Sequence, residues 1–238
     1  MKVYQKRDLT IIETPGDIFV IACDSSGGIG IKPCDRLQVD PFIVGKYSAR
    51  VALMEVLSVG ADPLVLINTL CVEMNPTGKR ILEGILKEAG DVSIVTGSSE
   101  ENMETVQTGI GITVVGICES LRINLCRTGD SIAAVGIPSM GPDVLVHEQD
   151  FPTGDDVARL RCLPYIGDII PVGSQGIRTE ANHMGLIRFL DSPIDMDTSC
   201  GPCTVVLVTL PPHKIGALES AINKPLHIIG EILNPMEL

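Results

Sequence analysis

Short apolar runs alternate with polar turns along the first half of the chain, a pattern typical of β-strands separated by loops. Each run is rich in Val, Ile and Leu, and glycine, proline or small polar residues stand near its ends. These features predict strands over residues 17–23, 63–73, 92–97 and 109–118.

Two segments between these runs have helical features instead. In residues 42–60, apolar positions recur every three or four residues from Val44 to Leu57. A glycine ends the segment and a proline follows shortly after, which is the usual end of a helix. A second helix is expected from Thr77, as its N-cap, to Glu88.

The second half repeats this mixture of strands and helices after a shift in composition at RTGD, residues 127–130. We therefore expect two domains, over residues 1–126 and 127–238, and an α+β fold of mixed α/β layers. The predicted strands of the second domain cover residues 131–138, 168–174, 203–210 and 226–233. Its predicted helices cover residues 154–163, 178–190 and 214–222.

The composition narrows the class of protein. The chain of 238 residues is 45% hydrophobic and only 3% aromatic, and its mean hydropathy is +0.30. Its longest apolar runs have the length of strands, so we expect no membrane span and assign the surplus aliphatic surface to a subunit interface. A net charge of −12 argues against nucleic acid as a partner. The N-terminus lacks the apolar segment of a signal peptide, so a cytoplasmic protein is expected.

The eight cysteines favour structural thiols. Cys23, Cys71 and Cys118 lie in apolar strands, where a free thiol behaves as a small hydrophobic group. The CGPC at residues 200–203 has the spacing of a redox site. A predicted strand follows it, however, and the helix dipole that lowers the pKa of such a thiol is missing.

The stretch CDSSGGIGIK, residues 23–32, is the first candidate for chemistry. Glycines at positions 27, 28 and 30 would let the backbone turn around a ligand and present its N–H groups. Asp24 at the strand end suits a metal ion, and Lys32 suits a phosphate. The alternative is an ordinary loop between two strands, because glycine-rich turns are common.

Two further acids stand where a ligand site could use them. Glu55 lies in an apolar helical stretch, and Glu100 and Glu101 follow a predicted strand directly. Together with Asp24 they could hold Mg²⁺, which takes oxygen ligands from a few carboxylates and from substrate phosphates. The alternative is that each acid is a solvated surface charge.

The order of these segments resembles the N-terminal half of the aminoimidazole ribonucleotide synthetase superfamily, whose members are called PurM-like. The segments are DSSGGIGIK, ALMEVLSVGADPL, TGSSEEN and GIGITVVG, and the resemblance covers about residues 17–118. The superfamily also includes thiamine-monophosphate kinase, selenophosphate synthetase and the hydrogenase maturation protein HypE. Glu55 stands where the family has the Asp of an Asn-Asp pair, and Met54 replaces the Asn.

The resemblance implies an ATP-binding domain that dimerises through a shared β-barrel, followed here by a shortened C-terminal α/β domain. Asp24, Glu55 and Glu100 would then be the acids that hold Mg²⁺ on ATP, with Asp24 as the catalytic residue. The other residues expected to contact the nucleotide are Gly27, Gly28, Gly30, Lys32, Gly97, Ser98, Ser99 and Asn102. Thr105 and Gln107 are further polar candidates beside Asn102, and the alternative for these three is the polarity of an edge strand.

Within the superfamily the pattern is most similar to the α-ribazole kinases of cobamide (cobalamin) salvage, which phosphorylate a ribose hydroxyl. The Asp-Asp-Ala and Ser-Asp-Gly-Leu motifs of thiamine-monophosphate kinase and the reactive Cys of selenophosphate synthetase are missing. The resemblance implies a kinase that moves the γ-phosphoryl group of Mg·ATP to a nucleoside-like acceptor, working as a homodimer. Two alternatives stay open. One is another ATP-dependent enzyme of the superfamily, such as a thiamine-monophosphate kinase or an amidine-forming synthetase, and the other is a non-catalytic nucleotide-binding or assembly protein.

Overall fold

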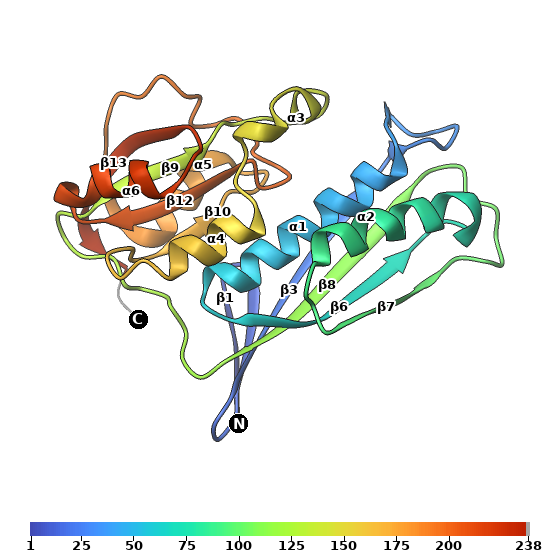
Figure 1. Cartoon of the computed structure of the whole chain (residues 1–238), viewed down its shortest axis with the longest axis horizontal. Coiled ribbons are helices and arrows are strands. Elements are labelled where there is room, and N and C mark those ends of the chain that lie inside the picture. Colours follow the sequence, from blue (N-terminus) through green and yellow to red (C-terminus); the bar gives the residue numbers. More distant parts are fainter. Residues whose placement is uncertain (237–238) are drawn as a thin grey trace. The chain divides into compact units, whose positions relative to one another are not determined.

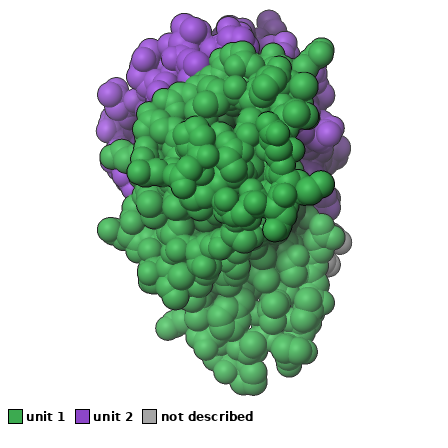
Figure 2. Space-filling view, turned by 90° about the vertical axis from the view of Figure 1, so that its right-hand side faces the viewer, with its two compact units in different colours: residues 1–56, 61–120 green, residues 57–60, 121–238 purple. Residues whose placement is uncertain are grey.

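The computed structural model describes residues 1–236 of the chain (Figure 1). It contains two compact units, coloured separately in Figure 2. Unit 1 consists of residues 1–56 and 61–120, and unit 2 of residues 57–60 and 121 onward. The division falls at residues 120 and 121, where the sequence predicted 126 and 127. Both units combine strands with helices, which confirms the predicted α+β fold.

Unit 1 is a six-stranded sheet with two helices and a short two-stranded ribbon. The strand order is β1-β2-β3-β8-β6-β7, and only the last pair is parallel. The strands are β1 (Lys2–Lys6), β2 (Leu9–Glu13), β3 (Ile18–Gly27), β6 (Asp62–Leu70), β7 (Ile94–Ser99) and β8 (Gly109–Cys118). The helices are α1 (Pro41–Ser58) and α2 (Lys79–Ala89), and the ribbon pairs β4 (Ile29–Gly30) with β5 (Leu37–Gln38).

The two faces of this sheet have different surroundings. Alternate residues such as Val20, Leu66 and Val114 are fully buried on the face that α1 and α2 cover. On the other face, Ile67 of β6 and Ile94 of the edge strand β7 are exposed. Because successive side chains of a strand point to opposite faces, the sheet has one packed face and one open, largely apolar face.

Helices α1 and α2 lie side by side in Figure 1, and their backbones touch. A methyl group at Gly45 would collide with the carbonyl oxygen of Ile81, and one at Gly84 would collide with that of Phe42. Both glycines are therefore required by the close crossing of the two helices, and they fix the position of α2 on α1.

Unit 2 is built on a five-stranded antiparallel sheet with the order β10-β12-β9-β13-β11. Every residue of the central strands β9 and β12 is buried. The strands are β9 (Ser131–Gly136), β10 (Ile169–Pro171), β11 (Gly185–Phe189), β12 (Val205–Leu210) and β13 (Leu226–Pro235). The helices are α3 (Asp143–Val146), α4 (Gly154–Arg161), α5 (Gly176–Ala181) and α6 (Ile215–Ala221).

Four local predictions are wrong. Strand β3 continues through Gly27, so Asp24 lies within a strand because its backbone stays paired with β8. Thr77 lies in a π-helical turn before α2 and is not the N-cap of that helix. The helix predicted over 178–190 ends early, because the chain reverses at a glycine with positive φ and continues as β11.

The fourth correction concerns the thiols. Cys23 and Cys71 are exposed, because Cys23 lies on the open face of the unit 1 sheet and Cys71 lies just beyond the end of β6. Cys200 and Cys203 of the CGPC segment are buried, and burial raises the pKa of the Cys200 thiol to about 12. A strand, β12, follows that segment as predicted. Among the described residues no helix is long and apolar enough to cross a membrane.

The close helix crossing leads to a stability prediction. Replacing Gly84 with Ala should lower the free energy of unfolding by about 1–3 kcal/mol, because the helices must move apart to admit the methyl group. Gly216→Ala is the matched control, since this glycine of α6 has open space around its Cβ position. In the control, the gain in helix propensity should leave the stability equal or higher. Urea denaturation of the two variants measures the difference, and equal stabilities would contradict the crossing.

Candidate functional site

Four strand ends of unit 1 meet at one edge of its sheet. Gly27 at the end of β3 pairs with Gly109 at the start of β8, and Leu70 at the end of β6 lies between Ile110 and Ser99 of its two neighbours. The loops that leave these ends therefore lie close together. They contain the rest of the glycine-rich turn, together with Glu100 and Glu101.

The glycine-rich turn is held in shape by a buried carboxylate, that of Asp35. Its oxygens accept hydrogen bonds from the backbone N–H of Lys32 (2.8 Å) and from the N–H (2.8 Å) and hydroxyl (2.7 Å) of Thr108. At Gly30 the φ is +153°, and a Cβ would lie 2.7 Å from Asp35 Oδ2. Only glycine fits there, so the turn and the carboxylate specify each other.

The backbone donors of this turn are partly in use. The N–H of Gly28 donates to the carbonyl oxygen of Thr108 at 2.8 Å. The side-chain amide of Gln107 donates to the carbonyl of Cys34 at 3.1 Å. The hydroxyl of Thr105 is buried and has no hydrogen-bond partner within residues 1–236. The turn is thus fastened to the segment that precedes β8.

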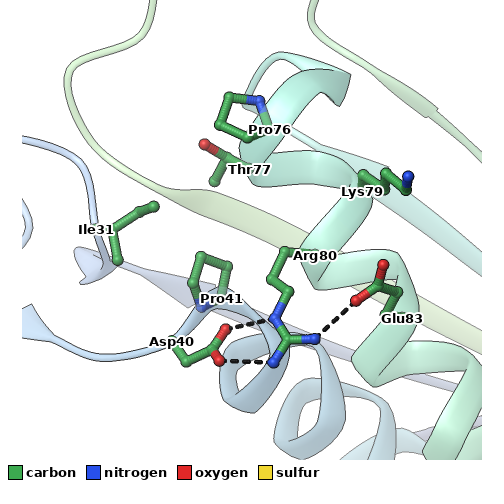
Figure 3. Close-up of a pocket in the computed structure, with 8 residues that line it drawn as sticks. All are labelled: Ile31, Asp40, Pro41, Pro76, Thr77, Lys79, Arg80 and Glu83. Carbon is green, nitrogen blue, oxygen red and sulfur yellow. Dashed lines mark hydrogen bonds and ion pairs between the residues drawn. The ribbon is translucent and has the colours of Figure 1, made fainter.

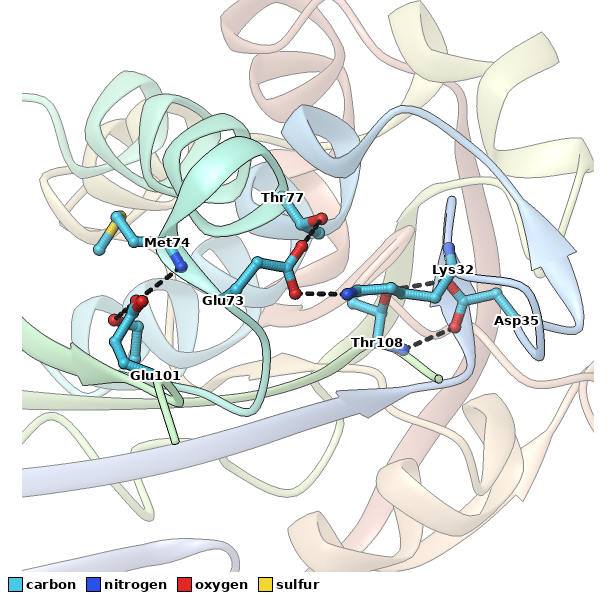
Figure 4. Close-up of polar contacts among 8 residues, drawn as sticks. Lys32, Asp35, Glu73, Met74, Thr77, Glu101 and Thr108 are labelled. Carbon is cyan, nitrogen blue, oxygen red and sulfur yellow. Dashed lines mark hydrogen bonds and ion pairs between the residues drawn. The ribbon is translucent and has the colours of Figure 1, made fainter. Parts of the chain in front are cut away.

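Lys32 reaches from the turn to the segment that follows β6. Its ammonium forms an ion pair with Glu73, and the hydroxyl of Thr77 donates to the other oxygen of that carboxylate at 2.6 Å (Figure 4). Burial alone would raise the pKa of Glu73, but the hydrogen bonds from Lys32 and Thr77 outweigh it and lower the pKa below its ordinary value. The ionised form of the Glu73 carboxyl is therefore favoured.

Asp24 has different surroundings. It follows the buried Val20 and Ala22 on the helix-covered face of β3 and is half-buried there. Burial raises the pKa of its carboxyl to about 6, although a backbone hydrogen bond at Ser25 opposes the shift. In the part of the chain that the structure describes, no cation pairs with this carboxylate. An acid destabilised in this way is a candidate for binding a metal ion or a proton.

Glu55 does not join this edge. Its carboxylate forms an ion pair with Arg7 at 2.7 Å, and both side chains are about nine-tenths buried. The neighbouring Val56 packs at Gly116, which pairs with Val20 on β3. Val20 is four residues from Asp24 along β3, a separation of about 13 Å. Glu55 therefore lies near another part of the strand.

Glu100 and Glu101 lie at the site edge but bind their own loop. The carboxylate of Glu100 accepts the backbone N–H groups of Asn102 (2.7 Å) and Met103 (3.1 Å). Glu101 accepts the N–H of Met74 (2.7 Å) and the hydroxyl of Ser99 (2.8 Å). These contacts join the end of β7 to the segment that also carries Glu73.

The two remaining predicted residues belong to β7 itself. Gly97 passes over Asn68 of β6, and a Cβ at Gly97 would collide with the Asn68 backbone and side chain. Ser98 pairs with Thr69 and is exposed on the open face. Close packing against Asn68 therefore explains why residue 97 is a glycine.

The donor set limits what kind of metal site this edge can offer. Within residues 1–236, no three His, Cys, Asp or Glu side chains are arranged to hold a metal ion. Mg²⁺ that arrives on a nucleotide needs only one or two carboxylates, because phosphate oxygens and water complete its shell. Asp24 meets that smaller requirement, since its carboxylate has no competing cation.

An open pocket of about 550 Å³ lies beside the Glu73 segment, against the first turns of α1 and α2 (Figure 3). Arg80 crosses it, donating two hydrogen bonds to Asp40 (2.9 and 2.7 Å) and one to Glu83 (2.7 Å). The lining residues are Ile31, Asp40, Pro41, Pro76, Thr77, Lys79, Arg80 and Glu83. Thr77 contributes both to this pocket and to the Lys32–Glu73 contact.

Sequence reasoning missed the residues that organise the site, which are Asp35, Glu73 and Thr108. Glu73 carried a signal, because it is the last residue of the predicted strand 63–73, much as Asp24 comes directly after the predicted strand 17–23. Asp35 and Thr108 carried none, since their contact joins residues 73 positions apart.

Comparisons with known proteins identify similar folds and a matching family model. Residues 8–118 match the family model described as AIR synthase related protein, N-terminal domain. The match includes the glycine-rich turn, both helices and the strands from β2 to β8. No curated protein sequence matches the chain.

Solved structures match nearly the whole chain. Thiamine-monophosphate kinase from Stenotrophomonas maltophilia K279a has a TM-score of 0.67 at 14% identity, covering 98% of this chain and 89% of that one. The complex of AaThiL with AMPPCP and TMP has a TM-score of 0.64 at 17% identity, with 94% and 84% covered. E. coli HypE, a hydrogenase maturation protein, has a TM-score of 0.63 at 14% identity, with 90% and 80% covered.

At these identities the structural likeness shows the fold alone, and that fold is the expected PurM-like one. The family match covers residues 8–118, which lie almost entirely in unit 1, and the solved structures share the fold of nearly the whole chain. The chain also spans most of the length of these structures, so its second unit has a counterpart in them.

The raised pKa of Asp24 gives a prediction that needs no ligand. An aspartate with a raised pKa favours the folded state at low pH, and this contribution is lost as the pH rises from about 4 to about 6. Asp24→Asn has no carboxyl group at this position, so its stability does not fall in this way as the pH rises. Its unfolding free energy relative to the natural chain should therefore increase over the same range and stay constant above it. Asp17→Asn, an exposed position in the β2–β3 turn, is the control and should show no such change. Denaturation curves from pH 4 to 8 measure both differences, and a flat difference for Asp24→Asn would refute the raised pKa.

Proposed function

We propose that this protein is a cytoplasmic kinase that transfers the γ-phosphoryl group of Mg·ATP to a hydroxyl of a small nucleoside-like molecule. The first candidate for the acceptor is the ribose hydroxyl of α-ribazole. The observations that support the proposal are the fixed glycine-rich turn with its Lys32 at the end of β3, and Asp24, which has no partner cation among the described residues, in the same strand of a PurM-like sheet.

The chemistry requires little covalent work from the protein. Phosphoryl transfer depends mainly on positioning and on neutralising charge, so a carboxylate and a lysine in a fixed turn are suitable groups. Mg²⁺ carried in on ATP would neutralise charge on the phosphates. In the proposal, Asp24 binds that ion and Lys32 contacts phosphate oxygens, while Asp35 keeps the turn between them in shape. The pocket lined by Ile31 and Thr77 offers space for a ligand group.

A second acceptor has support of its own. One structure with this fold is a complex with AMPPCP and TMP, and two are thiamine-monophosphate kinases. Thiamine monophosphate is therefore the alternative acceptor, although the motifs of that enzyme are missing from the sequence. An amidine-forming synthetase would release inorganic phosphate instead of a phosphorylated acceptor. A non-catalytic nucleotide-binding protein would bind ATP and transfer nothing. This alternative is included in the test because Glu55, one of the predicted metal ligands, forms an ion pair with Arg7.

Incubation with Mg·ATP and a panel of acceptors tests the proposal. We expect α-ribazole to gain the mass of one phosphate group, read by mass spectrometry, and thiamine monophosphate to stay unchanged. A phosphorylated thiamine product would select the alternative acceptor. Release of phosphate without a phosphorylated product would select a synthetase, and ATP binding without turnover would select the non-catalytic protein.

The same assay tests the role of Asp24. Asp24→Asn should reduce Mg²⁺-dependent ATP binding and transfer by at least tenfold, because the amide cannot replace the carboxylate as a ligand of the cation. Asp17→Asn serves again as the control and should retain activity. Full activity of Asp24→Asn would remove the assigned role.

We also infer that the chain forms a homodimer through the open face of the unit 1 sheet. Val3, Ile67 and Ile94 are all at least one-third exposed on this face. A wide apolar surface on a soluble domain is typical of an interaction site, and the resemblance implies a shared barrel formed there. The pairing would also cover Cys23.

A charge placed on this face tests the dimer. Ile67→Asp should convert the dimer to a monomer, because a desolvated carboxylate in an apolar interface is strongly unfavourable. Leu86→Asp is the matched control, since Leu86 is exposed on α2 and lies away from the open face. Light scattering coupled to gel filtration gives the mass of each variant. A natural chain that is already monomeric, or a dimer that survives the substitution, would contradict the inference.

A further inference from the structure

The lysine assigned to the phosphates already holds an anion. The ammonium of Lys32 contacts Oε2 of Glu73, and the two side chains are 12% and 31% exposed. A carboxylate at this position occupies the place that a phosphate oxygen would take. Nucleotide binding at Lys32 must therefore displace or share this contact.

Each member of the pair is also held by a second contact. The backbone N–H of Lys32 donates to Asp35 at 2.8 Å, and Thr77 donates to Glu73 at 2.6 Å. These contacts come from opposite sides, one from the glycine-rich turn and one from the segment before α2. The ion pair thus ties the turn to that segment, as Figure 4 shows.

We infer that Glu73 is a positioning residue that holds the Lys32 ammonium at the turn and competes with the nucleotide phosphates for it. This inference rests on the proposed function, because it requires Lys32 to contact phosphate. Glu73 then acts as an internal stand-in for the phosphate, occupying Lys32 in the empty enzyme and returning to it when the product leaves.

Competition between Glu73 and the nucleotide predicts the direction in which nucleotide affinity changes when Glu73 is replaced. Removing the charge of Glu73 frees the lysine and also removes a negative charge beside a polyanionic ligand. Glu73→Gln should therefore bind Mg·ADP and a non-hydrolysable Mg·ATP analogue roughly tenfold more tightly. A purely structural Glu73 would change the thermal stability of the variant and leave nucleotide affinity unchanged. A Glu73 that binds the cation would give weaker binding in Glu73→Gln, with a greater requirement for Mg²⁺.

The experiment is a double-mutant cycle over Glu73→Gln and Lys32→Met, with affinities measured by calorimetry at two salt concentrations. Lys32→Met alone should weaken binding. Adding Glu73→Gln to Lys32→Met should bring no gain, because the freed lysine is absent. Asp91→Asn, which removes an acid just beyond the C-terminal end of α2, is the charge-matched control and should change affinity less than twofold.

The outcomes distinguish a failure of the inference about Glu73 from a failure of the proposed function. Tighter binding by Glu73→Gln only when Lys32 is present supports the inference. An equal gain in both backgrounds shows a general charge effect and overturns it, as does unchanged or weaker binding. If the natural chain binds no nucleotide, the proposed function fails and the inference fails with it. If it binds nucleotide and Glu73→Gln shows no gain, the inference fails alone.

Discussion

The site depends on one buried carboxylate. Asp35 accepts hydrogen bonds from Lys32 and Thr108 and thereby closes the glycine-rich turn against the start of β8. A buried carboxylate is stable only when such donors satisfy it, so the turn keeps a single shape. Lys32 points toward Glu73 because its own backbone is fixed by this contact. The positions of the turn, the lysine and the segment before α2 all follow from it.

The elements of the fold were largely predictable, because strands and helices leave local patterns. Residues 109–118 and 42–60 were correctly assigned from periodicity and from their end signals. The errors arose where a distant partner decides the structure. Strand β3 continues through its glycines because β8 pairs with it, and residues 185–189 form a strand because β13 is alongside. No local pattern contains that information.

The site was predictable only in part, for the same reason. The sequence indicated Asp24, Lys32 and the glycine-rich turn because they are consecutive and chemically distinctive. It also suggested Glu55, which the structure places with Arg7 at another part of the sheet. Nothing in the helical stretch around Glu55 reveals that partner, 48 positions earlier in the chain. The acid that meets Lys32 is Glu73, whose role follows from its position after β6.

The glycine crossing of α1 and α2 limits how this protein can respond to a ligand. Where two backbones touch without intervening side chains, there is no flexible layer that could absorb a sliding movement. Glu73 and Thr77 lead directly into α2, so they must travel with both helices or stay still. Any adjustment on binding therefore has to come from the side chain of Lys32, since Asp35 holds its backbone in place. Glu73 is thus the stationary partner of the Lys32–Glu73 contact, and Lys32 is the partner that moves.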